Sequence, residues 1–331
     1  MQDRLAALDR WLAAVLAGAP YERTLAAADA SPRRYHRVRL GEGRSYVAMD
    51  APPACEDCRP FVRVAALLRA AGVNAPRVHA QDLAQGFLLL DDLGTRTYLE
   101  AFSAEDAAHA DRLMHDAISA LVRWQLASRP GVLPPYDEAL LRRELELFAL
   151  WYAERHLGRA LDAALRAAFD AVATTLVRCA LAQPRVYVHR DYMPRNLMCA
   201  EPNPGVLDFQ DATYGPIAYD LVSLLRDAFV SWDEEQVRAW ARRYWEAARA
   251  ARLPVAGFAE FWRDFEWTGL QRHLKVLGVF ARLSHRDGKP RYLADAPRFV
   301  GYARAVARRW RELAPLARLL DALECDAPAA A

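Results

Sequence analysis

Two short stretches decide the fold expected for this chain: VHRDYMPRNLM at Val188–Met198 and LDFQD at Leu207–Asp211. Together they contain an aspartate at position 191, an asparagine five residues later, and a second aspartate after a further short apolar run. Kinase folds place a catalytic carboxylate and two magnesium ligands in this order. A His-Arg-Asp triplet alone could be a capped or salt-bridged turn. The matching spacing of Asn196 and Asp208 favours the kinase-like interpretation.

Each of the three polar side chains suits one task in phosphoryl transfer. Asp191 is the candidate catalytic base, which orients an acceptor hydroxyl and accepts its proton. Asn196 and Asp208 are candidate ligands of Mg²⁺, a hard cation that prefers oxygen donors. Short apolar runs flank all three positions, so we expect polar side chains at the tips of buried strands to form a rigid site.

The sequences HRDYMPRN at His189–Asn196, LDFQD at Leu207–Asp211 and YDL at Tyr219–Leu221 resemble the aminoglycoside phosphotransferase and choline kinase superfamily. More narrowly, they resemble the bacterial anomeric kinases of N-acetylmuramate and N-acetylglucosamine. The resemblance implies ATP and Mg²⁺ as cofactors, and transfer of the γ-phosphoryl group to the anomeric hydroxyl of these sugars in peptidoglycan recycling. It also implies structural support of the catalytic loop by His189 and Asp220.

The fold class implied by the resemblance is α/β (α+β), a two-lobed protein-kinase-like fold. Residues 1–92 would form a small β-rich N-terminal lobe that covers the nucleotide. Residues 93–331 would form a large helical lobe with the catalytic loop and the substrate site. The local patterns agree, with helical apolar stripes after residue 103, a glycine hairpin at 41–43, and β-like runs at 24–27, 35–40 and 45–49.

The loop at Ala28–Arg34 lies where a kinase fold places its phosphate-covering loop, although it contains no glycine. The Ser31 hydroxyl, Arg33 or Arg34, and backbone N–H groups are therefore candidate phosphate contacts. A solvated basic turn is an equally good interpretation of the same residues.

The stretch Phe87–Gly94 reads as a buried strand that runs into a turn, and it resembles the hinge between the two lobes of a kinase. Adenine would be bound there by backbone groups around Asp92 and Leu93.

The third expected strand departs from the wider kinase pattern. Where kinases read VAIK with a phosphate-binding lysine, residues Val47–Asp50 read VAMD, and the only lysines of the chain are Lys275 and Lys289. Either Asp50 points away from the phosphates, or an arginine of the preceding loop replaces the lysine, and we favour the second interpretation. Without a lysine partner, Glu56 is assigned no role.

In the superfamily, helices of the C-terminal lobe determine substrate specificity. Arg272, His273 and Lys275 are accordingly candidates to bind a lactyl carboxylate or sugar hydroxyls, with a solvated helix face expected for at least two of them. Arg195 and Asp211, beside the catalytic segment, are further candidate substrate contacts.

Composition excludes several functional classes. The formal net charge of +2, without a long basic run, does not favour nucleic acid or an acidic membrane surface as a partner. Five cysteines without a secretory context indicate a reducing compartment. There is no uninterrupted apolar run of about 18 residues, the length needed to span a membrane. We expect a cytoplasmic monomer that acts on a small amino-sugar, with no nucleic-acid or membrane partner.

Two alternatives stay open. Within the superfamily the acceptor could be an aminoglycoside, choline or homoserine, because a fold does not fix its substrate. The mixed, arginine-rich C-terminal helices are weak evidence against a cationic acceptor. The chain could also be an inactive nucleotide-binding scaffold, which the missing lysine would suggest. The presence of Asp191, Asn196 and Asp208 together opposes that alternative.

Overall fold

The computed structural model describes residues 2–28, 32–102 and 106–325, and the chain divides into two compact units. The first unit comprises Met1–Trp124 and Arg195–Asp211, and the second comprises Gln125–Pro194 and Ala212–Ala331. The functional division expected after residue 92 stays a prediction.

A five-stranded antiparallel sheet is the framework of the first unit, with the strand order β1-β2-β3-β5-β4. The turn Gly41–Gly43 joins β2 to β3, and the register pairs Arg34 with Asp50. The strands and the hairpin predicted from the sequence are confirmed. The five strands are β1 (Tyr21–Ala28), β2 (Arg34–Leu40), β3 (Ser45–Asp50), β4 (Val78–Asp82) and β5 (Phe87–Asp91).

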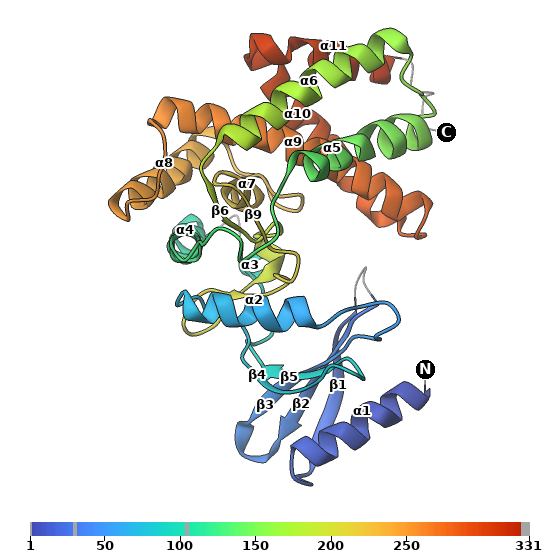
Figure 1. The fold of residues 1–331 in the computed structure, drawn as a ribbon, viewed down its shortest axis with the longest axis vertical. Coiled ribbons are helices and arrows are strands. Elements are labelled where there is room, and N and C mark those ends of the chain that lie inside the picture. The colour runs from blue at the N-terminus through green and yellow to red at the C-terminus, as the bar shows by residue number, and fades with distance from the viewer. Residues whose placement is uncertain (1, 29–31, 103–105, 326–331) are drawn as a thin grey trace. The chain divides into compact units, whose positions relative to one another are not determined.

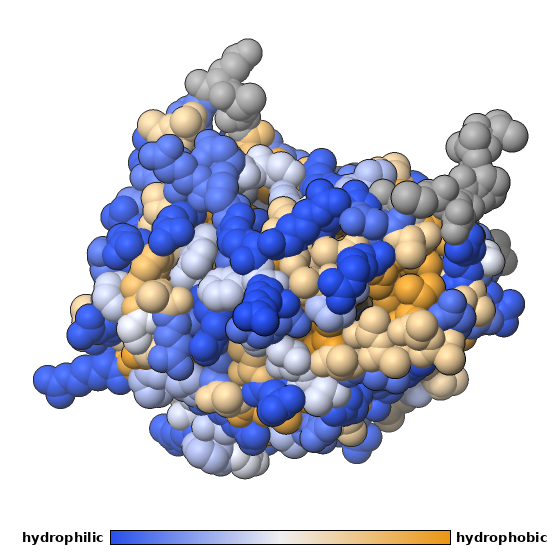
Figure 2. Space-filling model, turned by 90° about the horizontal axis from the view of Figure 1, so that it is seen from above, coloured by the Kyte–Doolittle hydropathy of each residue, from blue (hydrophilic) through white to orange (hydrophobic). Residues whose placement is uncertain are grey.

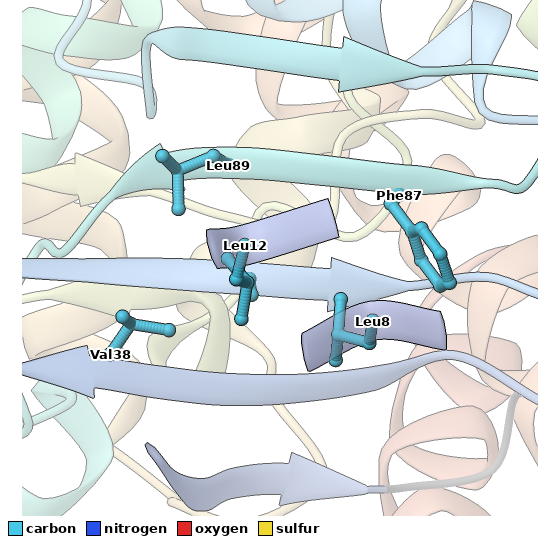
Figure 3. Close-up of a cluster of buried hydrophobic side chains, with 6 residues drawn as sticks. Leu8, Leu12, Val38, Phe87 and Leu89 are labelled. Atoms are coloured by element: carbon cyan, nitrogen blue, oxygen red, sulfur yellow. The ribbon is translucent and has the colours of Figure 1, made fainter. Parts of the chain in front are cut away.

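Two helices, α1 (Gln2–Val15) and α2 (Arg59–Ala70), lie on opposite faces of this sheet (Figure 1). On the α1 face, Leu8 and Leu12 are completely buried against side chains of β2, β3 and β5 (Figure 3). Burial of each leucine contributes about 1.5–3 kcal/mol. On the other face, α2 buries Phe61, Val64, Ala65 and Leu68 at helical spacing.

The remainder of the first unit surrounds the segment that carries the candidate metal ligands Asn196 and Asp208. A short helix, most of a long helix and a two-stranded ladder complete it: α3 (Tyr98–Ala101), α4 (Ala107–Leu126), β7 (Leu197–Met198) and β8 (Gly205–Val206). A capping box between Thr97 and Glu100 begins α3. Thr97 also bridges to Met198 of β7, which fixes the short ladder to the rest of the unit.

Helices dominate the second unit around the long helix α9 (Phe258–His285), whose residues from Phe261 to Ala281 are mostly buried. The strands β6 (Arg185–Val188) and β9 (Thr213–Pro216) form its only ladder among the described residues. The other elements are α5 (Glu138–Leu147), the π-helix η2 (Phe148–His156), α6 (Ala163–Ala182), α7 (Tyr219–Leu225), α8 (Glu234–Ala250), the 3-10 helices η4 (Pro290–Asp295) and η5 (Arg311–Leu313), α10 (Ala296–Arg309) and α11 (Ala314–Cys325).

Surface composition agrees with an ordinary globular protein. Figure 2 shows one face of the molecule, on which hydrophilic residues are interspersed with smaller apolar patches. Of the helices formed by the described residues, none combines the length and apolar character needed to cross a membrane.

The packing of α9 yields a prediction about two helical glycines. A Cβ atom on Gly278 would lie 2.3 Å from the carbonyl carbon of Leu147, whereas a Cβ atom on Gly301 of α10 would meet no heavy atom within 4 Å. We expect Gly278→Ala to lower the free energy of unfolding by about 1–3 kcal/mol through overpacking. Gly301→Ala should instead raise it by up to about 1 kcal/mol through helix propensity. Urea unfolding measures both, and a stabilised Gly278→Ala variant would contradict this account of the packing.

Candidate active site

The candidate catalytic segment begins where β6 ends, in the second unit. Val188 pairs with Thr213 of β9, and the chain then turns at Arg190, which has a positive φ of 77°. Such a backbone is uncommon for a residue with a Cβ atom. The turn is held by Asp220, a fully buried carboxylate in the first turn of α7, which accepts hydrogen bonds from the backbone N–H groups of His189 at 2.7 Å and Arg190 at 2.9 Å.

This turn presents Asp191 at the surface of the second unit, where 36% of its side chain is exposed. Its backbone N–H donates to Nδ1 of His189 at 3.3 Å, so the buried histidine also contributes to the shape of the loop. The supporting roles predicted for His189 and Asp220 in catalysis stay predictions, but both side chains contact the backbone of the loop directly.

Three cations determine the charge of Asp191. Burial favours the neutral acid, but Lys275, Arg272 and Arg190 outweigh it, and the pKa of Asp191 is lowered. The nearest guanidinium nitrogen, Nη2 of Arg272, lies 3.9 Å from its carboxylate. Asp191 is therefore ionised at neutral pH and can accept a hydrogen bond from a hydroxyl group, although it is a weak base.

A buried carboxylate that the sequence analysis missed, Glu144 of α5, compensates two of these cations. It binds Nη2 of Arg190 at 2.5 Å and Nζ of Lys275 at 3.0 Å, and it accepts hydrogen bonds from the Tyr136 hydroxyl and from Nε2 of Gln271 at 3.2 Å. Burial works against its charge, yet the cations lower its pKa to about 2. The available sequence signal was an acid within the apolar stripe of Leu141 and Leu145.

The expectation that at least two of Arg272, His273 and Lys275 face solvent is wrong. Arg272 and His273 are buried, and the Lys275 side chain is only 12% exposed. The reason is that α9 runs through the interior of the second unit, where Asp191 and Glu144 offset the two cations. His273 has no exposed surface and packs against the rings of Phe299 and Tyr302, so its predicted substrate contact stays a prediction.

The two candidate metal ligands lie together in the first unit. Nδ2 of Asn196 is 3.5 Å from Oδ2 of Asp208, and the Leu207 backbone N–H donates to the carbonyl of Asn196 at 2.9 Å. Nε2 of Gln210 donates to the other carboxylate oxygen of Asp208 at 3.0 Å. Asp208 has a positive φ of 61°, a strained backbone of a kind that clusters at functional sites. Hard oxygen donors on neighbouring side chains suit a magnesium ion.

Position 50, where kinases carry a phosphate-binding lysine, also belongs to the first unit. The Asp50 carboxylate, only 4% exposed, is bound by Arg4 of α1 at 2.6 Å. Arg33, just before β2, forms an ion pair with Glu56 at 2.8 Å. Glu56 therefore has a cationic partner, contrary to the reasoning that gave it no role.

The structure describes some of the remaining candidate nucleotide contacts and not others. Ser31 lies outside the described residues, and Arg34 begins β2 beside Asp50 in the register. The Asp92 carboxylate accepts hydrogen bonds from Arg37 at 2.7 Å and Ser45 at 2.5 Å, so its side chain is engaged by the sheet. Whether the backbone at Asp92 and Leu93 binds adenine stays a prediction.

Two substrate candidates flank the metal-ligand segment in the first unit. Arg195 precedes Asn196 and is partly buried, and Asp211 ends the segment with an exposed side chain. Their predicted contacts with an acceptor stay predictions.

Comparison with known proteins agrees with the kinase-like architecture. A family model described as the phosphotransferase enzyme family matches residues 22–258, and the chain belongs to this family. Among solved structures, a choline/ethanolamine kinase family protein from Mesorhizobium loti has a TM-score of 0.63 at 16% identity, covering 97% of this chain and 99% of that chain. The ADP-bound aminoglycoside phosphotransferase APH(2'')-Ib has a TM-score of 0.58 at 14% identity, covering 90% and 97%. These two likenesses show the fold.

Relatives of much higher identity extend over almost the whole chain. A Pseudomonas aeruginosa protein named N-acetylmuramate/N-acetylglucosamine kinase is 55% identical over 94% of this chain and 91% of its own length. A Neisseria meningitidis protein of the same name is 50% identical over 96% of each. The protein is an enzyme of the phosphotransferase class.

The low pKa of Glu144 leads to a prediction about acid stability. A carboxylate whose folded-state pKa is below its unfolded value stabilises the fold above the unfolded pKa, and this contribution is lost as the pH falls. A shift from 4.5 to about 2 corresponds to about 3 kcal/mol, lost between these two pH values. We expect Glu144→Gln to remove that part of the pH dependence and to lower the free energy of unfolding at pH 7 by about 3–5 kcal/mol, because buried cations lose their partner.

Denaturant unfolding at a series of pH values measures this effect. The matched control is Glu138→Gln on the same helix, because the side chain of Glu138 is 56% exposed and its pairing with Arg142 is a surface ion pair. Parallel stability profiles for the wild type and Glu144→Gln would contradict the role assigned to Glu144.

Proposed function

We propose that the protein is an ATP- and Mg²⁺-dependent sugar kinase. It phosphorylates the anomeric hydroxyl of N-acetylmuramate and N-acetylglucosamine, which gives the sugar 1-phosphate in the recycling of peptidoglycan. The single observation that carries the proposal is the 55% identity to the N-acetylmuramate/N-acetylglucosamine kinase of P. aeruginosa over 94% of this chain. We further propose that it acts in the cytoplasm as a monomer.

On the nucleotide side, Asn196 and Asp208 would hold magnesium. Within the described residues no group of three or more His, Cys, Asp or Glu side chains gathers as a metal site. Mg²⁺ commonly uses one or two protein ligands and takes its remaining ligands from phosphates and water. When bound, the ion would supply positive charge beside the phosphate oxygens. The Ser31 hydroxyl and either Arg33 or Arg34 are the proposed phosphate contacts, and the backbone at Asp92 and Leu93 is the proposed adenine contact.

On the acceptor side, Asp191 would accept a hydrogen bond from the anomeric hydroxyl and hold it in line with the γ-phosphorus. Its lowered pKa means that it takes the proton late, so most of the rate enhancement must come from positioning and charge neutralisation. The cations Arg272 and Lys275 beside Asp191 suit an acceptor with a carboxylate, such as the lactyl group of N-acetylmuramate. Arg195, Asp211 and His273 are proposed substrate contacts, of which His273 is completely buried.

The acceptor assignment is tested by ADP release from the purified protein with MgATP and each of N-acetylmuramate, N-acetylglucosamine, kanamycin and choline. We expect acceptor-dependent release with the two sugars, since the named relatives act on them. Release with kanamycin or choline alone would leave a kinase but overturn the sugar assignment. If no acceptor causes ADP release although MgATP still binds, the result would favour an inactive nucleotide-binding scaffold.

Because Asp191 and Asp208 are assigned different roles, we expect a conservative substitution of each to have a different effect. Asp191→Asn should lower kcat by roughly 10²- to 10⁴-fold, the range of general-base effects, and leave the Mg²⁺ concentration for half-maximal activity unchanged. Asp208→Asn should lower kcat at least as much and also raise that concentration, because it removes a charged ligand. Measuring ADP release over a range of Mg²⁺ concentrations distinguishes the effects of the two substitutions.

The exposed Asp170 of α6, as Asp170→Asn, is the matched control and should behave as the wild type. Near-normal turnover by Asp208→Asn would contradict the assignment of Asp208 as a magnesium ligand.

A further inference from the structure

Asp50 occupies the strand position at which kinases carry their phosphate-binding lysine. Its side chain points away from the face of the sheet that would bind phosphate. Asp50 lies opposite Arg34 in the register, and its carboxylate bonds to Nε of Arg4 at 2.7 Å. Arg4 belongs to α1, which covers the face of the sheet opposite to α2 (Figure 1). Asp50 is thus a buried structural carboxylate of the α1 face. Neither lysine of the chain belongs to this unit.

Arg33 extends toward the other face. Its Nε and Nη2 both donate to Oε2 of Glu56, at 3.1 and 2.8 Å. Glu56 precedes α2, and the two side chains are 13% and 15% exposed. In kinases a lysine–glutamate ion pair of this kind connects the sheet to the following helix and must form for phosphate to be bound correctly. A guanidinium has five N–H donors in a planar fork, and its positive charge attracts phosphate oxygens while it is paired with a carboxylate.

The Arg33–Glu56 pair is also close to the candidate metal ligand. Burial disfavours the charged form of Arg33, but the hydrogen bond to Glu56 and nearby negative charges, that of Asp208 included, raise its pKa overall. Phe209, the residue after Asp208, packs against Phe61 of α2, with ring centroids 4.7 Å apart and ring planes at 39° to each other. Both the cation and the metal-ligand turn are therefore fixed against the α2 segment.

We propose that Arg33, held by Glu56, replaces the lysine of the lysine–glutamate pair and contacts the phosphates of the bound nucleotide. Arg33 is then the phosphate-binding residue and Glu56 a positioning residue, while Arg34 has no part in phosphate binding. The inference rests on the proposed use of ATP and does not depend on the identity of the acceptor.

Binding of MgATP to the purified protein, measured by calorimetry without any acceptor, tests the proposal separately from the sugar assignment. We expect Arg33→Met to weaken binding about ten- to hundredfold, as the loss of a charge-assisted hydrogen bond does. Arg33→Lys should keep part of the affinity. The matched control is Arg39→Met on β2, the strand that Arg33 precedes; the Arg39 side chain is exposed, and the variant should bind as the wild type.

A double-mutant cycle separates positioning from a general loss of structure. Glu56→Gln should weaken MgATP binding in the wild type but have little further effect in the Arg33→Met background, because it acts through Arg33. Unchanged binding by Arg33→Met, or an equal loss on Arg34→Met, would overturn the proposal. Normal MgATP binding by wild type and weakened binding by Arg33→Met, without any sugar phosphorylation, would uphold it while the proposed acceptor fails.

Discussion

The compensation of buried charge around Glu144 is the interaction on which the catalytic segment depends. Two cations, Arg190 and Lys275, lie within 3.0 Å of one carboxylate that is only 6% exposed. A buried ion pair of this kind is costly to break because the remaining charge loses both water and partner. Since Arg190 immediately precedes Asp191, the same contact helps to fix the backbone from which the proposed catalytic carboxylate projects.

The electrostatics of the second unit follow from this arrangement. Asp191 shares Lys275 and Arg190 with Glu144, and it has Arg272 as a further cation, so its pKa is lowered. Asp220, in contrast, is fully buried, and burial raises its pKa to about 7 although two backbone N–H groups and the charge of Arg272 oppose this. The carboxylate proposed as the catalytic base is therefore kept charged, while Asp220 holds the backbone of the loop.

Local sequence patterns were sufficient to predict strands and a helix of the first unit. They also singled out Asp191, Asn196 and Asp208 as candidate site residues. The alternation in β2 and β3, the glycine turn at 41–43 and the apolar spacing of α2 each depend on neighbouring residues only. The partners of buried charges could not be predicted in this way. Glu144 meets residues 46 and 131 positions away, and Glu56 meets an arginine 23 positions before it. Such pairs are determined by tertiary packing and leave only a weak signal, a charged residue within an apolar stripe.

The most direct test of the central claim is proton-coupled phosphorus NMR of the product formed from N-acetylmuramate, MgATP and the wild-type protein. The account predicts one new sugar phosphate whose phosphorus couples to a single proton, the anomeric one. Coupling to the two protons of the primary carbon would place the phosphate elsewhere on the sugar and contradict the claim. The absence of any new phosphate ester, under conditions where kanamycin or choline is phosphorylated, would contradict it as well.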